Sequence, residues 1–311
     1  MDKLRIFSGN SNPALAIEMC ADLGIELSPL KVSRFSNDNL FVKVHCNVRE
    51  RDVFVVQSFS EPVNDHIIEL FIIMDALRSA SARRITAIIP YFSYARSDKK
   101  DAPRISITGR LMADLIKTAG ADRVLTMDLH SDAVHGFFSM PVDHLTAIPL
   151  IADEIRKNVA LSNAVVVATD AGGAKRVGKF AQNLGIPMAI IDKRRYSDTQ
   201  VEQGLIVGEV AGKSAIIFDD EISTGSTLVS TAKTLKQHGV GKMIMGVTHP
   251  VLSGKAIENI EKANLDEIIV TNTVSMAGKE TPCIKVLSVA HLFAEAAKRI
   301  HTGESVGALF L

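Results

Sequence analysis

Two adjacent aspartates, Asp219 and Asp220, end an apolar run, and residues bearing hydroxyl groups follow within a few positions. If a helix starts here, its first backbone N–H groups are unpaired and its dipole attracts anions, phosphate above all. A glycine lets such a ligand approach the backbone closely. The segment therefore predicts a phosphate-binding loop made of Ser223, Thr224, Gly225, Ser226 and Thr227.

The acid pair cannot serve the phosphate directly, because like charges repel. Asp219 and Asp220 can instead accept hydrogen bonds from sugar hydroxyls, or hold a cation that bridges to the ligand. The pair beside a phosphate loop indicates a site for a sugar phosphate. The alternative is a simple helix start capped by Ser223 or Thr224, with Glu221 in solvent. Capping alone does not explain the two aspartates, so we favour the site.

Short β-branched runs alternate with helical stretches along the whole chain, and this alternation predicts the elements that position the loop. Continuous apolar runs of this length are typical of strands buried on both faces of a parallel sheet. Leu228, Ala232 and Leu235 are spaced for a helix over 226–238, with Gly239 at its C-terminal cap. The pattern predicts an α/β fold. The expected strands are 52–58, 84–91, 122–130, 163–170, 187–195, 214–220, 242–250 and 266–273.

Reactive polar groups gather where the predicted strands end. In open α/β sheets ligands bind at the carboxyl ends of the strands, so the set as a whole indicates a site, although any single member could merely mark a strand exit. Lys193 and Arg195 lie two residues apart and would share one face of an extended segment. The strand-end residues are Asp128, His130, Asp170, Lys193, Arg195, Asp219, Asp220 and His249.

Two further charged segments need an interpretation. Arg96, Lys99, Lys100 and Arg104 lie in one short stretch, which is either a solvated loop or a cationic cover for polyphosphate. The segment 173–180 imitates a P-loop, but its last position is Phe180, which has no hydroxyl for magnesium. We expect it to be part of a helix that continues to Leu184, with Gly172 and Gly173 in the turn before it.

Composition bounds the classes of protein. The chain has 311 residues, 47% of them apolar, and equal numbers of acidic and basic residues, 35 each. Without a basic excess a nucleic-acid binder is not expected. Three scattered cysteines fit a reducing compartment. No signal peptide or membrane span is visible, so we expect a cytoplasmic protein. The prolines near 139–154 suggest two domains, 1–147 and 148–311.

The stretch "IIFDDEISTGST" resembles the ribose-phosphate loop of type I phosphoribosyltransferases and of ribose-phosphate pyrophosphokinases, and does not distinguish the two. Four more stretches, 32–44, 90–100, 124–138 and 168–195, resemble the pyrophosphokinases in order and spacing. The resemblance implies two tandem phosphoribosyltransferase-type α/β domains. It also implies transfer of the β,γ-diphosphoryl group of ATP to the C1 hydroxyl of ribose 5-phosphate, with Mg²⁺ as cofactor.

The same resemblance assigns site residues. It makes Lys193 and Arg195 catalytic, and His130 and Asp170 metal ligands. Chemistry alone leaves His130 equally open to a hydrogen bond with Asp128, and it could also contact the nucleotide's phosphates. Asp219, Asp220 and the loop 223–227 bind ribose 5-phosphate. The residues implied in ATP binding are Phe35, Asn37, Asn39, Arg96, Ser97, Lys99, Arg104 and His130.

The sequence departs from the common family pattern at four positions. Asn37 and Asn39 stand where acids are frequent, Ser97 where glutamine is common, and Ser223 where the loop often has an acid. An amide can still pair with adenine edges, so adenine remains acceptable. The resemblance also implies hexamers built from dimers, with adenine sites shared between subunits. The rival functions are a phosphoribosyltransferase and a non-catalytic homologue that regulates true synthetases.

Overall fold

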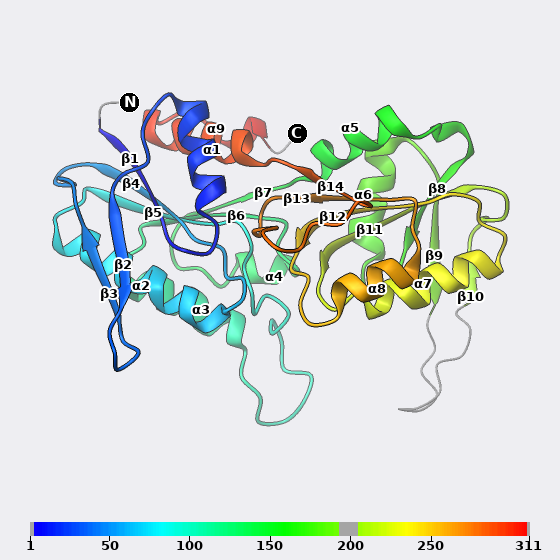
Figure 1. The fold of residues 1–311 in the computed structure, drawn as a ribbon, viewed down its shortest axis with the longest axis horizontal. Coiled ribbons are helices and arrows are strands. Elements are labelled where there is room, and N and C mark those ends of the chain that lie inside the picture. The colour runs from blue at the N-terminus through cyan, green and yellow to red at the C-terminus, as the bar shows by residue number, and fades with distance from the viewer. Residues whose placement is uncertain (1–2, 193–204, 310–311) are drawn as a thin grey trace. The chain divides into compact units, whose positions relative to one another are not determined.

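The computed structural model describes residues 3–192 and 205–309, which form two compact units (Figure 1). The first unit comprises Met1–Thr146, Thr273–Ser275 and Ser288–Leu311, and the second comprises Ala147–Asn272 and Met276–Leu287. The end of the chain thus belongs to the first unit. Each unit is a parallel or mainly parallel sheet covered by helices on both faces.

The sheet of the first unit is entirely parallel, because its strands are joined by helical crossovers rather than hairpins. Its strand order is β1-β4-β5-β6-β7. A separate antiparallel hairpin joins β2 to β3. The strands of this unit are β1 (Leu4–Ser8), β2 (Leu30–Arg34), β3 (Leu40–Val44), β4 (Asp52–Val56), β5 (Arg84–Ile89), β6 (Arg123–Met127) and β7 (Val142–Leu145).

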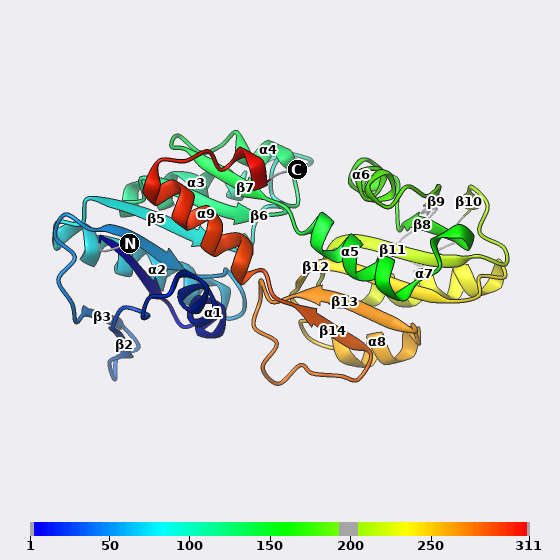
Figure 2. The same ribbon diagram turned by 90° about the horizontal axis from the view of Figure 1, so that it is seen from above.

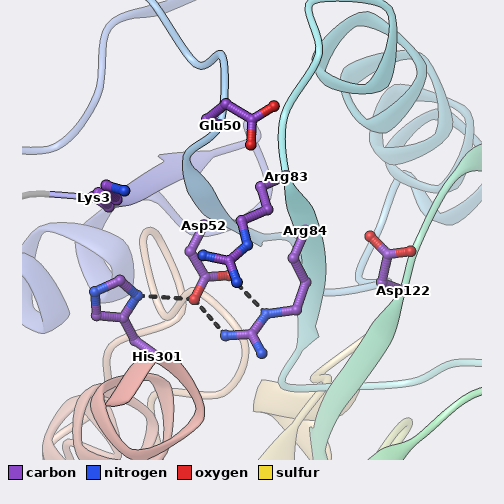
Figure 3. Close-up of a pocket in the computed structure, with 7 residues that line it drawn as sticks. All are labelled: Lys3, Glu50, Asp52, Arg83, Arg84, Asp122 and His301. Atoms are coloured by element: carbon purple, nitrogen blue, oxygen red, sulfur yellow. Dashed lines mark hydrogen bonds and ion pairs between the residues drawn. The ribbon is translucent and has the colours of Figure 1, made fainter. Parts of the chain in front are cut away.

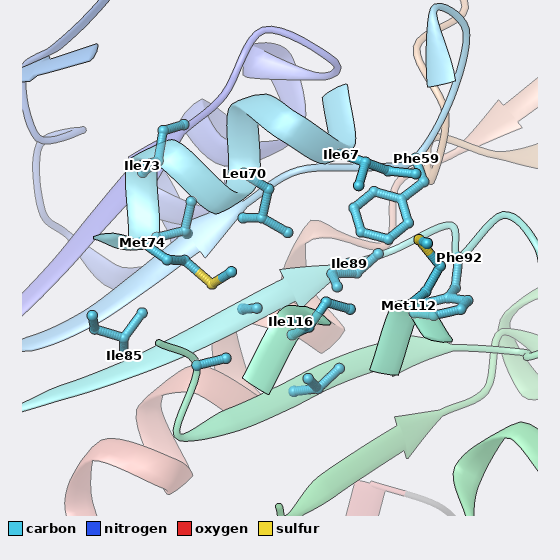
Figure 4. Close-up of a cluster of buried hydrophobic side chains, with 14 of the residues drawn as sticks. Phe59, Ile67, Leu70, Ile73, Met74, Ile85, Ile89, Phe92, Met112 and Ile116 are labelled. Atoms are coloured by element: carbon cyan, nitrogen blue, oxygen red, sulfur yellow. The ribbon is translucent and has the colours of Figure 1, made fainter. Parts of the chain in front are cut away.

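Helices cover the two faces of this sheet (Figures 1 and 2). On one face lie α1 (Pro13–Leu23) and α9 (Ala290–Thr302), and on the other α2 (Val63–Ser79) and α3 (Thr108–Ala119). A single turn, α4 (Asp132–His135), follows β6. Figure 4 shows the core that α2 and α3 form with the sheet. The largest side chains drawn there include Phe59, Leu70, Ile73, Phe92 and Ile116, all buried.

A charged network ties α9 to the amino-terminal ends of the strands (Figure 3). Asp52 accepts hydrogen bonds from both Arg84, whose Nε lies 2.8 Å away, and His301, whose Nδ1 lies 2.9 Å away. Arg84 also donates to the carbonyl of Ile300 at 2.8 Å. The side chains of Asp52, Arg84 and His301 line part of a pocket of about 400 Å³. The network joins residues that are more than 200 positions apart in sequence, and it anchors the last helix.

The second unit has seven strands in the order β10-β9-β8-β11-β12-β13-β14, all parallel except β10. α5 (Ile148–Asn158) and α6 (Ala174–Leu184) cover one face, and α7 (Ser226–Gln237) and α8 (Ala256–Ala263) the other (Figure 1). The strands are β8 (Ala164–Ala168), β9 (Met188–Asp192), β10 (Leu205–Val207), β11 (Ser214–Ile222), β12 (Met243–Pro250), β13 (Glu267–Thr271) and β14 (Ile284–Leu287).

The α/β fold with two mainly parallel sheets confirms the predicted class, and each expected strand has a counterpart whose ends lie within three residues of the predicted ones. One difference bears on the site. β11 does not stop at the aspartates but continues to Ile222, because Glu221 and Ile222 pair with His249 and Pro250 of β12. The acid pair is therefore held inside a strand rather than in the turn. Among the described residues, no helix is long and apolar enough to cross a membrane.

Candidate active site

The predicted phosphate loop lies between β11 and α7 at the carboxyl edge of the second sheet. Gly225 precedes the helix with a φ of 72°, a conformation that favours glycine, and α7 begins at Ser226. A Cβ at Gly225 would lie 3.2 Å from the Cβ of Asn259. The first amides of α7 thus lie at a helix N-terminus beside the acid pair, the arrangement expected of an anion site.

The loop is held in place by α8 and by the segment that precedes it. Asn259 donates through Nδ2 to the carbonyl of Thr224 at 2.8 Å, and the hydroxyls of Ser223 and Ser253 lie 3.1 Å apart. The amide of Ser253 donates to the carbonyl of Ser223 at 3.1 Å. Ser253 and Asn259 escaped the sequence analysis because nothing local marks a contact across 30 or more residues. They fix the loop before any ligand arrives.

The two aspartates differ sharply in their surroundings. Asp220 is 1% exposed and forms an ion pair with Arg176 of α6, whereas 31% of the Asp219 side chain is open to solvent. The Nη1 atom of Arg176 lies 3.8 Å from Oδ1 of Asp219, and that same oxygen accepts a hydrogen bond of 2.9 Å from the amide of Asp220. Arg176 was not predicted as a site residue.

The carboxyl group of Asp219 is unusually reluctant to ionise. Burial of the group raises its pKa well above the ordinary value, and the adjacent carboxyl of Asp220 raises the pKa further. The amide of Asp220 and the charge of Arg176 act in the opposite direction. The carboxyl oxygens of Asp219 can accept hydrogen bonds from the hydroxyl groups of a sugar.

Asp170 follows β8 and shapes the turn that leads into α6. It is exposed, and its Oδ1 accepts a hydrogen bond of 2.9 Å from the amide of Gly173. Helix α6 then runs from Ala174 to Leu184, which confirms that the P-loop-like segment lies in a turn and a helix. Because β8 and β11 are parallel neighbours, Asp170 lies at the same edge of the sheet as the acid pair.

The cationic stretch of the first unit forms a loop between β5 and α3. Arg96, Lys99 and Arg104 are exposed on it, which a cover for polyphosphate requires. Ser97, expected to contact ATP, has a structural task as well. Its Oγ donates to the carbonyl of Ser106 at 3.1 Å and accepts from the amide of Thr108, also at 3.1 Å, so it closes the base of the loop.

The hairpin between β2 and β3 carries the expected adenine segment at its tip. Phe35 is 55% exposed and contacts Phe41, with ring centroids 5.5 Å apart. Asn37 shapes the turn, since its Oδ1 accepts from the amide of Asn39 at 3.3 Å. The exposed face of Phe35 argues against the alternative of a packed loop aromatic. In Figure 1 the tip of the hairpin lies well away from the 96–104 loop of the same unit.

The remaining predicted residues are only partly described. His130 is half-buried just after β6 in the first unit, while Asp170 belongs to the second. Lys193 and Arg195 lie outside the described residues, directly after β9. Within residues 3–192 and 205–309, no three His, Cys, Asp or Glu side chains gather as a metal site. In each unit taken by itself, a single carboxylate or imidazole suits a cation that is held largely by substrate phosphates and water.

A parallel sheet with an acid pair and a glycine-capped loop at its carboxyl edge places the chain among α/β proteins of phosphoribosyltransferase type. Comparison with known proteins narrows this class. Residues 4–120 match the model of the N-terminal domain of ribose phosphate pyrophosphokinase, and residues 200–311 that of the phosphoribosyl synthetase-associated domain. The chain belongs to the ribose-phosphate pyrophosphokinase family.

Individual relatives cover almost all of the chain. Ribose-phosphate pyrophosphokinase of Deinococcus radiodurans is 50% identical over 315 residues, 99% of this chain and 98% of that protein. The enzyme of Clostridium acetobutylicum is 47% identical over 309 residues, 99% of this chain and 97% of that protein. Phosphoribosylpyrophosphate synthetase from Mycobacterium smegmatis superposes with a TM-score of 0.92 at 39% identity and covers 97% of this chain and 99% of that one.

Proposed function

We propose that this chain makes 5-phosphoribosyl 1-diphosphate from ATP and ribose 5-phosphate. The C1 hydroxyl attacks the β-phosphorus, the bond between that phosphorus and the bridging oxygen of the α-phosphate breaks, and AMP leaves as the hydroxyl releases its proton. Such transfers need no protein nucleophile, since positioning and neutralised charge carry them. The observation that supports the proposal best is the loop 223–227 at the N-terminus of α7, directly beside the acid pair.

In the proposed complex the 5-phosphate binds the amides and hydroxyls of residues 223–227. The ring hydroxyls lie next to Asp219 and Asp220. The interactions of the loop with Ser253 and Asn259 support this role, because they hold its backbone in a fixed shape and reduce the ordering cost of binding. The hydroxyl of Ser223 is already hydrogen-bonded to that of Ser253. Because this position carries a neutral serine where the family often has an acid, the phosphate loop is less negative and repels phosphate less.

ATP is assigned to the first unit. Arg96, Lys99 and Arg104 bind its phosphates from the loop whose base Ser97 closes, and His130 contacts the nucleotide or its cation. Phe35, Asn37 and Asn39 provide the adenine contact. Because the hairpin tip and the loop are well separated in one chain, the hairpin serves a neighbouring subunit, in agreement with hexamers built from dimers. Sedimentation that finds a fully active monomer would contradict this assembly.

Mg²⁺ fits the donors that are present, and Asp170 and His130 would hold it. When bound, it neutralises phosphate charge and orients the chain of phosphates. Lys193 and Arg195, next to the end of β9, supply fixed positive charge to the diphosphoryl group in transit. Asp170 is exposed, and the hydrogen bond that its Oδ1 accepts from the amide of Gly173 holds the carboxylate on a defined turn, which suits a ligand.

One assay decides among the candidate functions. Purified protein is mixed with ATP, Mg²⁺ and ribose 5-phosphate, and AMP is measured by chromatography. Release of AMP that depends on ribose 5-phosphate is expected. Consumption of phosphoribosyl diphosphate with a free base, and no AMP, would instead indicate a phosphoribosyltransferase. Nucleotide binding with no turnover of either kind would indicate a regulatory homologue. The same assay with other nucleoside triphosphates measures how strongly the protein, through Asn37 and Asn39, prefers adenine to other bases.

A further inference from the structure

The acid pair is not an isolated feature of β11, because helix α6 holds it from one side. Arg176 forms an ion pair with Asp220 and reaches Asp219 at 3.8 Å. The guanidinium group is mostly covered, with 23% of the side chain exposed, and Asp220 is 1% exposed. A carboxylate buried to this degree requires a partner, since an isolated charge is strongly disfavoured in a buried site. Arg176 is that partner.

Strand geometry separates the two aspartates. Successive side chains of a strand point to opposite faces, so Asp220 shares a face with Phe218 and Asp219 shares one with Ile217. Phe218 stacks on Phe180 of α6, with ring centroids 4.1 Å apart and an angle of 9°. Ile217 belongs to the core that α7 forms on the other face. Asp220 therefore lies on the face of α6, and Asp219 on the face where α7 and the phosphate loop begin.

Two contacts of α6 with β11 reinforce one another. Arg176 and Phe180 are four residues apart on the helix and lie on the same side of it, while Phe218 and Asp220 are two apart on the strand. The ring stack and the ion pair therefore fix the helix against the strand at two points. At its start, α6 is joined to the turn of Asp170 through the amide of Gly173. Arg176 thus links the turn of Asp170 to the acid pair.

From these contacts we infer that Arg176 is a positioning residue for the sugar: it keeps Asp220 buried as an anchor and so presents Asp219 as the carboxyl group that meets the ribose hydroxyls. The inference deepens the proposed function and rests on it. Arg176 neutralises part of the repulsion between the two acids, which would otherwise drive them apart. Without it, Asp220 would lose its ion pair with α6, and Asp219 would lose its defined position.

The test compares Arg176→Gln, Arg176→Lys and the matched control Lys179→Gln, which removes an exposed cation from the same helix. For Arg176→Gln we expect the KM for ribose 5-phosphate to rise tenfold or more, with less than a threefold change in the KM for ATP. Arg176→Lys should show a smaller rise in the KM for ribose 5-phosphate, because lysine keeps the positive charge but lacks the planar, two-pronged guanidinium group. Lys179→Gln should behave as the wild type. Equal KM values for ribose 5-phosphate in Arg176→Gln and the wild type would overturn the inference.

A double variant keeps the test valid if Arg176→Gln unfolds. Arg176→Gln with Asp220→Asn replaces the ion pair by neutral groups of similar shape, which buried sites commonly tolerate. The KM of the double variant for ribose 5-phosphate should be raised as much as that of Arg176→Gln or of Asp220→Asn alone. All three variants break the same ion pair between Arg176 and Asp220. A wild-type KM in the folded double variant would refute the positioning role. Calorimetric binding of ribose 5-phosphate to wild type and variants gives the same comparison without turnover, so loss of the proposed activity is distinguishable from loss of this role.

Discussion

The side chain of Ser97 bridges the two ends of the 96–104 loop by accepting a hydrogen bond from the amide of Thr108 at 3.1 Å. Through the same Oγ it donates to the carbonyl of Ser106. The next residue, Gly109, is tightly packed, as a Cβ there would lie 3.3 Å from the carbonyl oxygens of Ser97 and Tyr94. The base of the loop is thus tightly closed while its cationic side chains remain exposed.

Removal of this hydroxyl should weaken ATP binding rather than the fold. Ser97→Ala leaves the amide of Thr108 without its partner, at a cost of about 1 kcal/mol. We expect a threefold to tenfold rise in the KM for ATP and an unchanged KM for ribose 5-phosphate, measured by AMP release. Ser106→Ala is the control, because only its backbone carbonyl takes part. An unchanged KM for ATP in Ser97→Ala would show that the closure does not matter for the nucleotide.

A methyl group at Gly225 should damage the phosphate loop. The φ of 72° costs an alanine about 1–2 kcal/mol, and the added Cβ would meet Asn259 at 3.2 Å. Gly239→Ala is a matched control, because its φ of 74° is equally strained but nothing lies within 4 Å. Both variants should lose similar stability in urea unfolding. Only Gly225→Ala should lose ribose 5-phosphate affinity, by tenfold or more; equal affinity in the two would argue against the phosphate site.

The raised pKa of Asp219 makes stability depend on pH in a predictable direction. A group whose pKa is higher in the folded state stabilises the fold below its unfolded pKa, about 3.9, and this contribution is lost as pH rises through the folded pKa. Asp219→Asn has no proton to lose. The variant should therefore gain stability relative to the wild type as the pH rises above about 3.9, while its affinity for ribose 5-phosphate falls.

Urea unfolding at several pH values, followed by circular dichroism, measures this difference. The gap between Asp219→Asn and the wild type should widen as pH increases. If the difference in free energy of unfolding narrowed with increasing pH, the folded state would favour the ionised form of Asp219. That result would contradict the raised pKa of this group. Leu228→Val on α7 is the control, because this core substitution removes no titratable group and should shift stability by the same amount at every pH.

Asp52 should be important for the stability of the first unit. It is 8% exposed and pairs with Arg84 and His301, so Asp52→Ala leaves Arg84 without its carboxylate. We expect a loss of about 2 kcal/mol, below the value for a fully buried pair because Arg84 is 35% exposed. Asp75→Ala breaks an exposed pair with Arg78 in the same unit and should cost less than about 1 kcal/mol. Similar urea midpoints for the two variants would contradict the prediction.

Lys193, which lies outside the described residues, carries the catalytic prediction. Lys193→Ala should reduce kcat by a hundredfold or more, because a pre-placed cation stabilises charge that develops on the migrating diphosphoryl group. Binding of ribose 5-phosphate, measured by calorimetry, should change less than threefold. Lys179→Gln again serves as the control for loss of one positive charge. Near-normal turnover in Lys193→Ala would remove this residue from the catalytic role.

Local patterns in the sequence predicted most of the second sheet. The strands β8, β11 and β12 and the helix α7 were expected because apolar periodicity and capping residues act over a few positions. Gly225 before α7 was expected because a glycine lets a phosphate approach the backbone at a helix N-terminus. The strands β1, β2, β3, β7, β10 and β14 were not predicted. Of these, β7, β10 and β14 have three or four residues each, too few for a pattern to emerge from the surrounding loop.

The sequence by itself determined the α/β class, the acid pair before the phosphate loop and the glycine of that loop, because each depends on residues that are neighbours in the chain. Only the tertiary structure decided which aspartate is buried, since that follows from the face of β11 that α6 covers. It also decided that Arg176 neutralises Asp220 across 44 positions, and that α9 returns to the first sheet through Asp52 and His301. Such pairings are made by packing between distant segments, and no periodicity along the chain encodes them.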